Sequence, residues 1–323
     1  RPSTPPDRGT TSMRRLATLL LLLLAGPAAA AERLTVLLDW FVNPDHGPLV
    51  IAREKGFFAA EGLQVELVAP ADPNDPPKLV AAGKADIAIG YQPQLHLQVH
   101  EGLPLVRFGT LVATPLNSLV FLEGGPVRTL ADLKAKRVGF SVGGFEEALL
   151  GAMLEKAGLR LGEVRLVNVN FALSASLLAG QVDAVIGAFR NFELNQLALE
   201  GRPGRAFFPE EEGVPPYDEL IYLAHRDAVG RPELRRFLAA VERATFWILN
   251  RPDEAWTVFS GTAKELQDEL NRRAWAATLP RFAHAPAALD AGRYARFATF
   301  LHERGLIGPP PPVSTYAVDP GAR

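Results

Sequence analysis

The first part of the chain alternates between short apolar runs and stretches with apolar residues at helical spacing. Short runs with alternating or continuous apolar residues predict strands, and the longer periodic stretches predict helices. The predicted strands are Leu34–Leu38, Gln64–Val68, Ala85–Gly90, Leu105–Ala113 and Ser118–Leu122. The predicted helices are His46–Lys55, Pro76–Ala82 and Pro93–Glu101, and a glycine directly follows each of them, as at many helix ends. This order predicts a mainly parallel sheet with helices on both faces.

A second series of strands and helices begins near residue 129. Its predicted strands are Arg137–Phe140, Val164–Val169 and Ala184–Gly187. Its predicted helices are Thr129–Lys134, Phe145–Ala157, Ala172–Ala179 and Phe189–Glu200. The segments 79–90 (LVAAGKADIAIG) and 177–188 (LLAGQVDAVIGA) are alike. They are consistent with an internal duplication, or with two helix-to-strand turns of the same type.

The pattern changes after Tyr222, where amphipathic helices follow one another without strands. They are predicted at Pro232–Asn250, Pro252–Phe259, Lys264–Pro280 and Ala287–Gly305. Pro309–Pro312 then interrupts regular structure. We expect the tail to Arg323 to be loosely docked or disordered.

Two α/β units with helices appended predict two lobes joined by two crossing segments. The candidate crossings are Ser118–Leu122 and Glu219–Leu223. The first lobe is assigned residues 32–120 and 222–308, the second lobe residues 121–221, and the proline-rich tail residues 309–323. Ligands of such sheets bind beyond the carboxyl ends of the strands. We therefore expect a ligand site between the lobes, in the loops that follow strands.

The amino-terminal region has the pattern of an export signal. Residues 13–31 combine Arg14 and Arg15, an apolar run at 16–24 and an alanine-rich cleavage site at 28–31. The apolar run is too short to span a bilayer, which takes about 20 residues. Residues 1–12 are expected to be an untranslated leader or a disordered extension. The mature chain would then begin near Glu32 in the periplasm, and it is not a lipoprotein because no Cys follows the cleavage site.

Composition excludes several classes of function. The 34 Lys and Arg balance 36 Asp and Glu, so no basic excess is present for nucleic acid. The chain has no Cys, which removes thiolate metal sites, iron–sulfur ligation and Cys nucleophiles. No HExxH, P-loop, GxGxxG or GxSxG motif is present. We therefore predict no catalytic residue, no metal site and no cofactor.

The loop after the first predicted strand is the richest in ligand-binding side chains. It carries a carboxylate, an indole, an amide and an imidazole at Asp39, Trp40, Asn43 and His46. Asp39 can accept N–H groups and Trp40 can stack on a flat ring. His46 fits a ligand contact or a helix start equally well. Tyr91 and Gln92, which end another predicted strand, are weaker candidates.

Two later loops add further candidates. Ser141, Gly143, Gly144 and Phe145 form a glycine-rich helix start without a lysine. Because Glu146 in the first turn would repel a phosphate, this loop favours a polar or neutral group.

Phe189, Asn191 and Glu193 form the second group, in which Glu193 is expected one helical turn past Phe189 so that both face the cleft. A carboxylate beside an aromatic ring suits an aminopyrimidine-type ligand. Asn170 and Tyr217 complete the candidate set.

The segment 37–67 (LLDWFVNPDHGPLVIAREKGFFAAEGLQVEL) resembles the periplasmic substrate-binding proteins of ABC importers, in the group related to fungal thiamine-pyrimidine synthase. Further similar segments are GKADIAIGYQPQ (83–94), LADLKAKRVGFSVGG (130–144), LLAGQVDAVIGAF (177–189) and VPPYDELIYLAHRD (214–227). The resemblance implies a type II periplasmic binding protein fold with two crossover hinge strands. It also implies a thiamine-precursor pyrimidine as ligand, held by stacking and by a carboxylate. The positions that match are Asp39, Trp40, Asn43, Tyr91 and Glu193.

The resemblance sets the functional expectation: a monomeric solute-binding component that delivers a formylaminopyrimidine or hydroxymethylpyrimidine to an inner-membrane ABC permease. Riboflavin, a sulfonate or another small molecule remains an alternative ligand. A sensor or structural role without a permease partner remains an alternative function.

A synthase-like enzyme is the weaker alternative, because the residues of the fungal enzyme are absent. Its pyridoxal-phosphate lysine and its histidine fall near Gly90 and Gln94, and its Cys-rich motif falls near Pro215–Tyr222. Its phosphate-loop lysine falls where this chain has Gly144-Phe145-Glu146. We therefore expect a binding protein rather than an enzyme.

Overall fold

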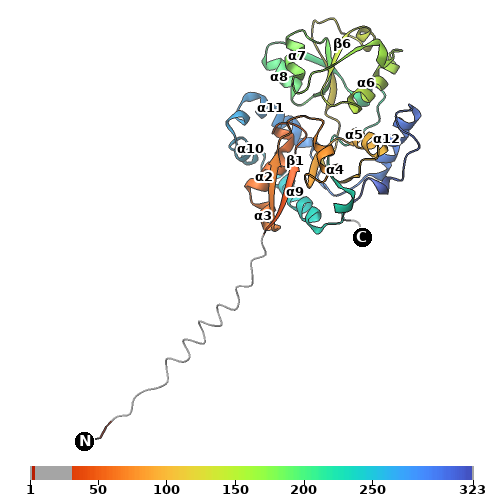
Figure 1. Ribbon diagram of the computed structural model, residues 1–323. Helices are drawn as coiled ribbons and strands as arrows, with labels where there is room; N and C mark the ends of the chain where they lie inside the picture. The colour runs from red at the N-terminus through yellow and green to blue at the C-terminus, as the bar shows by residue number, and fades with distance from the viewer. Residues whose placement is uncertain (1, 4–30, 322–323) are drawn as a thin grey trace.

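The computed structural model describes residues 2–3 and 31–321. The predicted signal peptide, apart from Ala31, and most of residues 1–12 lie outside the described residues. Within the described part of the chain, no helix combines the length and the apolar character needed to cross a membrane. Two five-stranded sheets with helices on their faces form two lobes (Figure 1), as the alternation of strands and helices predicts.

The first sheet has the strand order β2-β1-β3-β10-β4. β1 pairs parallel with β2 and β3, whereas β10 pairs antiparallel with β3 and β4. All eight residues of β4 are buried, because helices and the carboxyl-terminal segment cover it. Its strands are β1 (Glu32–Leu37), β2 (Leu63–Val68), β3 (Ile87–Gly90), β4 (Leu105–Val112) and β10 (Leu220–His225).

The second sheet repeats this arrangement with the order β7-β6-β8-β5-β9. β6 pairs parallel with β7 and β8, and β5 pairs antiparallel with β8 and β9. In each lobe one strand that arrives from the other lobe is inserted antiparallel into the sheet. The strands are β5 (Asn117–Leu122), β6 (Arg137–Phe140), β7 (Arg165–Asn168), β8 (Ala184–Phe189) and β9 (Gly204–Phe207).

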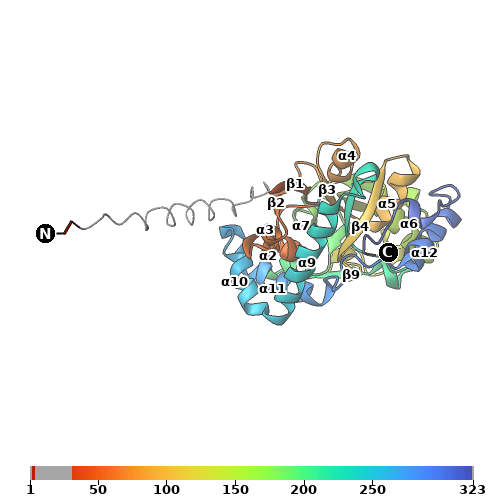
Figure 2. The same ribbon diagram turned by 90° about the horizontal axis from the view of Figure 1, so that it is seen from below.

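The helices agree with the predicted pattern in most places. Figure 1 shows α6, α7 and α8 around the second sheet, and Figure 2 shows α2, α3 and α9 side by side. Phe58 of α3 stacks on Phe237 of α9 at 5.3 Å between ring centres, which anchors the long helix to the first lobe. The helices of the two sheet series are α2 (Gly47–Glu54), α3 (Phe57–Ala60), α4 (Pro76–Ala81), α5 (Gln92–His100), α6 (Phe145–Lys156), α7 (Leu173–Leu178) and α8 (Glu193–Leu199). The later helices are α9 (Pro232–Asn250), α10 (Pro252–Ser260), α11 (Glu269–Thr278) and α12 (Ala291–Glu303).

Short 3₁₀ turns connect these elements. They are η1 (Pro44–His46), η2 (Leu130–Leu133), η3 (Leu161–Glu163), η4 (Pro209–Glu211), η5 (Arg226–Ala228), η6 (Lys264–Leu266), η7 (Leu279–Arg281) and η8 (Val313–Thr315). The predicted helix at 264–280 is therefore three pieces, η6, α11 and η7. The strand β9 was not predicted, since GRAF has neither alternation nor a β-branched residue.

The chain passes between the two sheets at 113–116 and at 208–219. The segments predicted as crossings, Ser118–Leu122 and Glu219–Leu223, lie almost wholly in β5 and β10, the strands on which the chain arrives. Sequence patterns mark these segments as extended, but only strand pairing shows to which sheet each belongs.

Glu219 ties the two passages together. Its Oε2 accepts the N–H of Leu116 at 2.6 Å and that of Asn117 at 2.9 Å. Arg190 donates to the carbonyls of the same two residues and pairs with Glu210 at 2.6 Å. Both passages are therefore held at one buried point.

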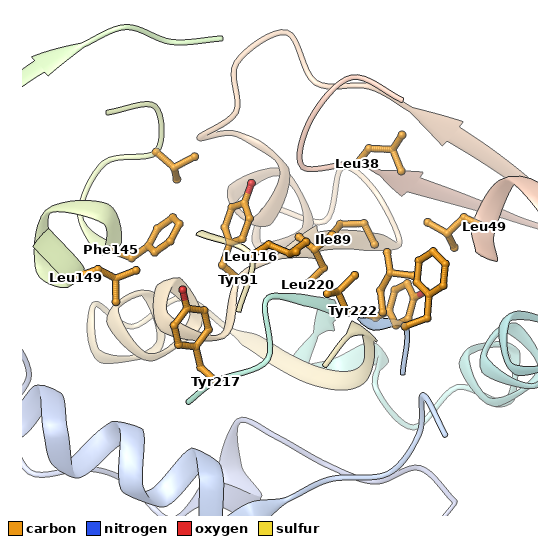
Figure 3. Packing of buried hydrophobic residues seen from close by; sticks show 14 of the residues in the cluster. Leu38, Leu49, Ile89, Tyr91, Leu116, Phe145, Leu149, Tyr217, Leu220 and Tyr222 are labelled. Atoms are coloured by element: carbon orange, nitrogen blue, oxygen red, sulfur yellow. The ribbon is translucent and has the colours of Figure 1, made fainter. Parts of the chain in front are cut away.

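The apolar core continues from one lobe to the other. Tyr91, at the end of β3, stacks on Phe145, the first residue of α6, with 4.8 Å between ring centres. Figure 3 shows this pair with Leu149 and Leu116 nearby in one buried cluster. The two lobes therefore contact each other directly beside the passages.

The expectation for the tail is wrong up to residue 318. Tyr316 and Ala317 are buried, and Ala317 pairs with Arg107 at the free edge of β4. The fully buried guanidinium of Arg107 donates to the carbonyl of Val318 at 2.8 Å and to that of Ala288 at 2.5 Å. A buried arginine needs such acceptors, so Arg107 anchors the tail although the prolines before it form no regular structure.

Replacing Tyr316 with Ala tests this anchoring. Loss of a fully buried aromatic side chain costs about 3 kcal/mol or more, which lowers the melting temperature by about 6 °C or more. Ser314→Ala, an exposed position of the same segment, serves as the control. Calorimetry of both variants measures the effect, and equal melting temperatures would show that the tail is not part of the folded unit.

Candidate ligand-binding site

A narrow cavity lies between the two lobes, and the space around it that atoms do not fill, open solvent included, is about 420 Å³. We call it the interlobe cavity. Its walls contain four acids, four aromatic residues and three others. These are Asp39, Asp45, Glu146 and Glu193; Trp40, Tyr91, Phe189 and Phe192; and Asn43, Leu173 and Gly187.

On the first lobe, Asp39 is held by two side chains. His46 Nε2 lies 2.9 Å from Asp39 Oδ1, and the Tyr91 hydroxyl donates to Oδ2 at 3.0 Å. The N–H of Asn43 donates to His46 Nδ1 at 3.3 Å, which assigns the imidazole proton to Nε2, facing Asp39. The Asn43 side chain in turn accepts the N–H of Asp45 at 2.8 Å and caps η1. The polar DWFVNPDH loop therefore folds onto its own side chains.

Asp45 connects the two lobes and α11. Its Oδ1 accepts from Asn191 Nδ2 at 2.6 Å and from the Thr278 hydroxyl at 3.0 Å. Burial raises the pKa of Asp45 to about 6, although His46, Asn191 and Thr278 all oppose that rise. Asn191 follows β8 and Thr278 ends α11, so three distant parts of the chain meet at this carboxyl group.

On the second lobe, Glu146 and Glu193 lie on either side of the end of β8. Glu146 accepts the N–H of Ser141 at 2.8 Å, and Glu193 accepts the N–H of Phe189 at 2.6 Å. Burial raises the pKa of each to about 8. Both carboxyl groups are therefore mainly neutral near pH 7, and each can donate as well as accept a hydrogen bond.

The aromatic residues come from both lobes. Trp40 meets Phe171 edge to face, with 4.5 Å between ring centres, and Phe41 meets Phe192 at 6.1 Å. Phe189 stands perpendicular to Tyr91 at 6.5 Å. These rings offer flat surfaces to a planar ligand.

No lysine or arginine borders the interlobe cavity. Arg190, which directly follows β8, is engaged by Glu210 and by the carbonyls of Leu116 and Asn117, and its guanidinium covers Phe208 at 4.0 Å. The described residues also contain no group of three or more His, Cys, Asp or Glu side chains that could hold a metal ion. The cavity therefore suits a neutral or cationic ligand better than an anion.

Six of the predicted site residues meet at the cavity, namely Asp39, Trp40, Asn43, Tyr91, Phe189 and Glu193. His46 lies directly behind Asp39 and is fully buried. Asn191 holds Asp45. Phe189 and Glu193 were expected one turn apart on the same helix, and this placement is wrong. Phe189 is the last residue of β8 and Glu193 is the first residue of α8.

The other predicted residues do not border the cavity, and each has a structural partner. The N–H of Gly143 donates to Asn74 at 2.9 Å, that of Gly144 donates to Glu147, and Phe145 packs on Tyr91. The Ser141 hydroxyl donates to the carbonyl of Asn170. The glycine-rich loop therefore has its N–H groups engaged.

Gln92 and Tyr217 lie near the passages instead. Gln92 accepts the N–H of Asp218 at 2.8 Å, and Tyr217 is buried edge to face against Phe297. Both belong to the connection between the lobes.

Five cavity residues were not predicted. Four of them lie in or next to the strand-following loops that the sequence predicts as the site, namely Asp45, Glu146, Gly187 and Phe192. The rule that ligands bind beyond strand ends therefore locates these loops, but it does not predict which of their side chains face the cavity. Leu173 begins α7 as an ordinary core residue, and the sequence contains no signal for it.

The fold and this cavity define a two-lobed α/β protein with a cavity between its lobes. The NMT1/THI5 like family matches residues 43–255, and the chain belongs to this family.

Two relatives are similar over most of the chain. A Haemophilus influenzae protein named for thiamine biosynthesis is 53% identical over 91% of this chain and 94% of its own. The formylaminopyrimidine-binding protein of Halalkalibacterium halodurans is 38% identical over 75% of this chain and 73% of its own.

More distant relatives include enzymes. The 4-amino-5-hydroxymethyl-2-methylpyrimidine phosphate synthase of Legionella pneumophila is 25% identical over 84% of this chain and 88% of its own. Among solved structures, the alkanesulfonate-binding protein SsuA of Xanthomonas axonopodis has a TM-score of 0.71 at 18% identity, covering 90% of this chain and 99% of that one. The last comparison confirms the two-lobed fold of a periplasmic binding protein.

The buried acids predict how stability depends on pH. The pKa of Glu219 is raised by burial to about 7, and those of Glu146 and Glu193 to about 8. These values exceed the value of about 4.3 in an unfolded chain, so the folded state binds these protons more tightly. The stability they confer is complete below the unfolded pKa and is lost as pH rises through the folded pKa.

We therefore expect the free energy of unfolding of the ligand-free protein to fall by more than ~1 kcal/mol between about pH 6.5 and about pH 8.5. The pKa of buried His96 is lowered to about 3, so this histidine is neutral in the folded state; its unfolded pKa of about 6.5 lets it oppose the fall only at the lower end of the interval. Urea unfolding at several pH values measures the slope, and Glu219→Gln should make it shallower. A stability that stays level or rises over this interval would contradict the assignment.

Proposed function

We propose that the protein is the solute-binding component of an ABC importer and that its ligand is a thiamine-precursor pyrimidine, such as formylaminopyrimidine or hydroxymethylpyrimidine. The observation that carries this proposal is a cavity between two lobes with carboxyl groups and aromatic rings and no basic residue. The formylaminopyrimidine-binding relative supports the ligand class.

The hydrogen-bonding groups and the flat ring of an aminopyrimidine match the lining of the interlobe cavity. Its exocyclic amine is a donor beside a ring nitrogen that accepts. A neutral Glu193 carboxyl, with its pKa near 8, has the reverse pattern of one acceptor and one donor. Trp40 and Phe189 supply apolar surfaces for the flat ring.

Binding requires the lobes to separate and close. Asp39 and Glu146 are each 3% exposed, so a ring cannot reach them while the lobes are in contact. A ligand that touches both lobes stabilises the closed form by its extra contacts there. In this proposal a permease in the inner membrane recognises the closed form, and the mature protein acts in the periplasm as a monomer.

Because some relatives are synthases, an enzymatic function is the second candidate. The described residues favour ligand binding over catalysis. At Gly90, where the resemblance to the fungal enzyme would place its lysine, a Cβ would lie 2.7 Å from Leu223. Gln94, near the position of the enzyme's histidine, is buried in α5. We therefore propose transport rather than catalysis.

A thermal-shift panel on the chain from Glu32, confirmed by calorimetry, tests the ligand. The panel contains formylaminopyrimidine, hydroxymethylpyrimidine, thiamine, riboflavin, taurine and nitrate. A ligand at 100 times its dissociation constant adds about 2.7 kcal/mol to stability. We expect Trp40→Ala to weaken pyrimidine binding about fivefold or more, because ring stacking is worth about 1–3 kcal/mol.

Trp247→Ala is the matched control, since Trp247 lies on α9 away from the cavity. We expect it to bind the pyrimidine like the wild type. A shift with riboflavin, taurine or nitrate and none with a pyrimidine would reject the proposed ligand.

Small-angle X-ray scattering tests closure. Saturation with the pyrimidine should reduce the radius of gyration, because the ligand favours the conformations in which both lobes contact it. Trp40→Ala at the same ligand concentration should show a smaller reduction. Unchanged scattering at confirmed saturation would contradict the closure mechanism.

A further inference from the structure

Glu146 has its protein partners on one side only. It stands in the first turn of α6, and its Oε2 accepts the N–H of Ser141 at 2.8 Å. The N–H of Val142 also donates to this carboxyl group. Both donors belong to the loop before the helix, so they fix the orientation of the carboxyl group without using its side toward the cavity.

The opposite side of the carboxyl group lies against Gly187. A Cβ at this glycine would lie 2.4 Å from Glu146 Oε1, so only glycine leaves room for the acid at this point of β8. Gly187 also has a φ of +96°, and its own N–H donates to Asn117 at 3.0 Å. The N–H of Gly187 is therefore engaged away from the acid, and the two residues form one corner of the cavity.

The surroundings of Glu146 disfavour a negative charge. The titratable groups that face it are Glu147, Glu219 and the hydroxyl of Tyr91, which itself donates to Asp39. No cation borders the cavity. Burial among acids without a cation favours the neutral carboxyl form, in agreement with the pKa of about 8. A neutral carboxyl group has one O–H donor, and because Oε2 accepts from Ser141, Oε1 beside Gly187 is the oxygen better placed to carry the proton.

We propose that Glu146 is a specificity-determining residue that donates this O–H to an uncharged oxygen acceptor on the ligand, and that Gly187 makes the position possible. The inference rests on the proposed function. It adds that recognition selects an oxygen-bearing substituent, such as a formyl or hydroxymethyl group, as well as the aminopyrimidine ring. A ligand without that oxygen leaves the buried donor unpaired and therefore binds more weakly.

The test compares two ligands and two variants. The ligands are hydroxymethylpyrimidine and its analogue with a methyl group in place of the hydroxymethyl group. We expect the wild type to prefer the first by about fivefold or more. Glu146→Met should abolish this preference, and Glu146→Gln should restore most of it, because its amide is a donor of nearly the same shape.

Two results would overturn the proposal. A preference that persists in Glu146→Met shows that Glu146 does not contact the oxygen. The second result is that Glu146→Gln loses the preference for hydroxymethylpyrimidine although its ligand-free melting temperature equals that of the wild type. This would show that Glu146 acts as a charged carboxylate and not as a donor.

Gly187→Ala gives an independent test of the corner. Its Cβ would displace the carboxyl group, so the ligand preference should fall as in Glu146→Met. Gly213→Ala is the matched control, because Gly213 has a φ of +99° and no atom close to the position of a Cβ. Both variants therefore strain the backbone, but only Gly187→Ala brings a Cβ against Glu146. A preference lost equally in both variants would contradict the role of Gly187.

Infrared spectroscopy of the ligand-free protein separates this inference from the proposed function. The carbonyl stretch of a protonated carboxyl group should be present at pH 7 and reduced in Glu146→Gln. If no pyrimidine binds but this difference is seen, the proposed function fails and the neutral donor stands. If the difference is absent, the donor assignment fails whatever the ligand.

Discussion

The joining of the two passages by Glu219 is the constraint on which the site depends. One carboxyl oxygen accepts two N–H groups of the other passage, and Arg190 satisfies the carbonyls of the same residues. A fixed pivot at this point sets how β3 and β8 approach each other. The carboxyl ends of these two strands carry Tyr91 and Phe189, so the pivot determines the distance across the interlobe cavity.

Around this pivot the lobes are held by contacts of different kinds. Tyr91 packs on Phe145, Asn74 accepts from Gly143, and Asp45 holds Asn191 and Thr278. Hydrogen bonds require a particular orientation of donor and acceptor, whereas the aromatic contact requires only close packing. Together these contacts allow few relative positions of the two lobes in the closed form. In the proposed opening for a ligand, these buried hydrogen bonds break and water solvates their groups, which keeps the free-energy cost of opening moderate.

The cavity concentrates acids where solvent is scarce, and this explains its chemistry. Carboxyl groups in water are charged acceptors, whereas here burial moves the pKa of Glu146 and Glu193 to about 8. The same residue type then supplies donors as well as acceptors. An aromatic amine with a ring nitrogen and an oxygen substituent fits such a surface, whereas a sulfonate or nitrate would need a cation that the lining does not contain.

The sequence by itself determined the repeated strand–helix order, the two-lobed class and the loops in which the site lies, because apolar periodicity and strand-end loops are local properties. Asp39, Trp40 and Glu193 could be found in this way. Tertiary structure alone decided that Phe189 ends a strand, that Leu173 reaches the cavity, and that the glycine-rich loop is engaged within the protein. It also decided that Tyr316 packs behind four prolines and that burial raises the pKa of Glu146 to about 8. These outcomes depend on burial and on partners far away in the chain, such as Arg107 for the tail and Gly187 for Glu146, and no local pattern carries that information.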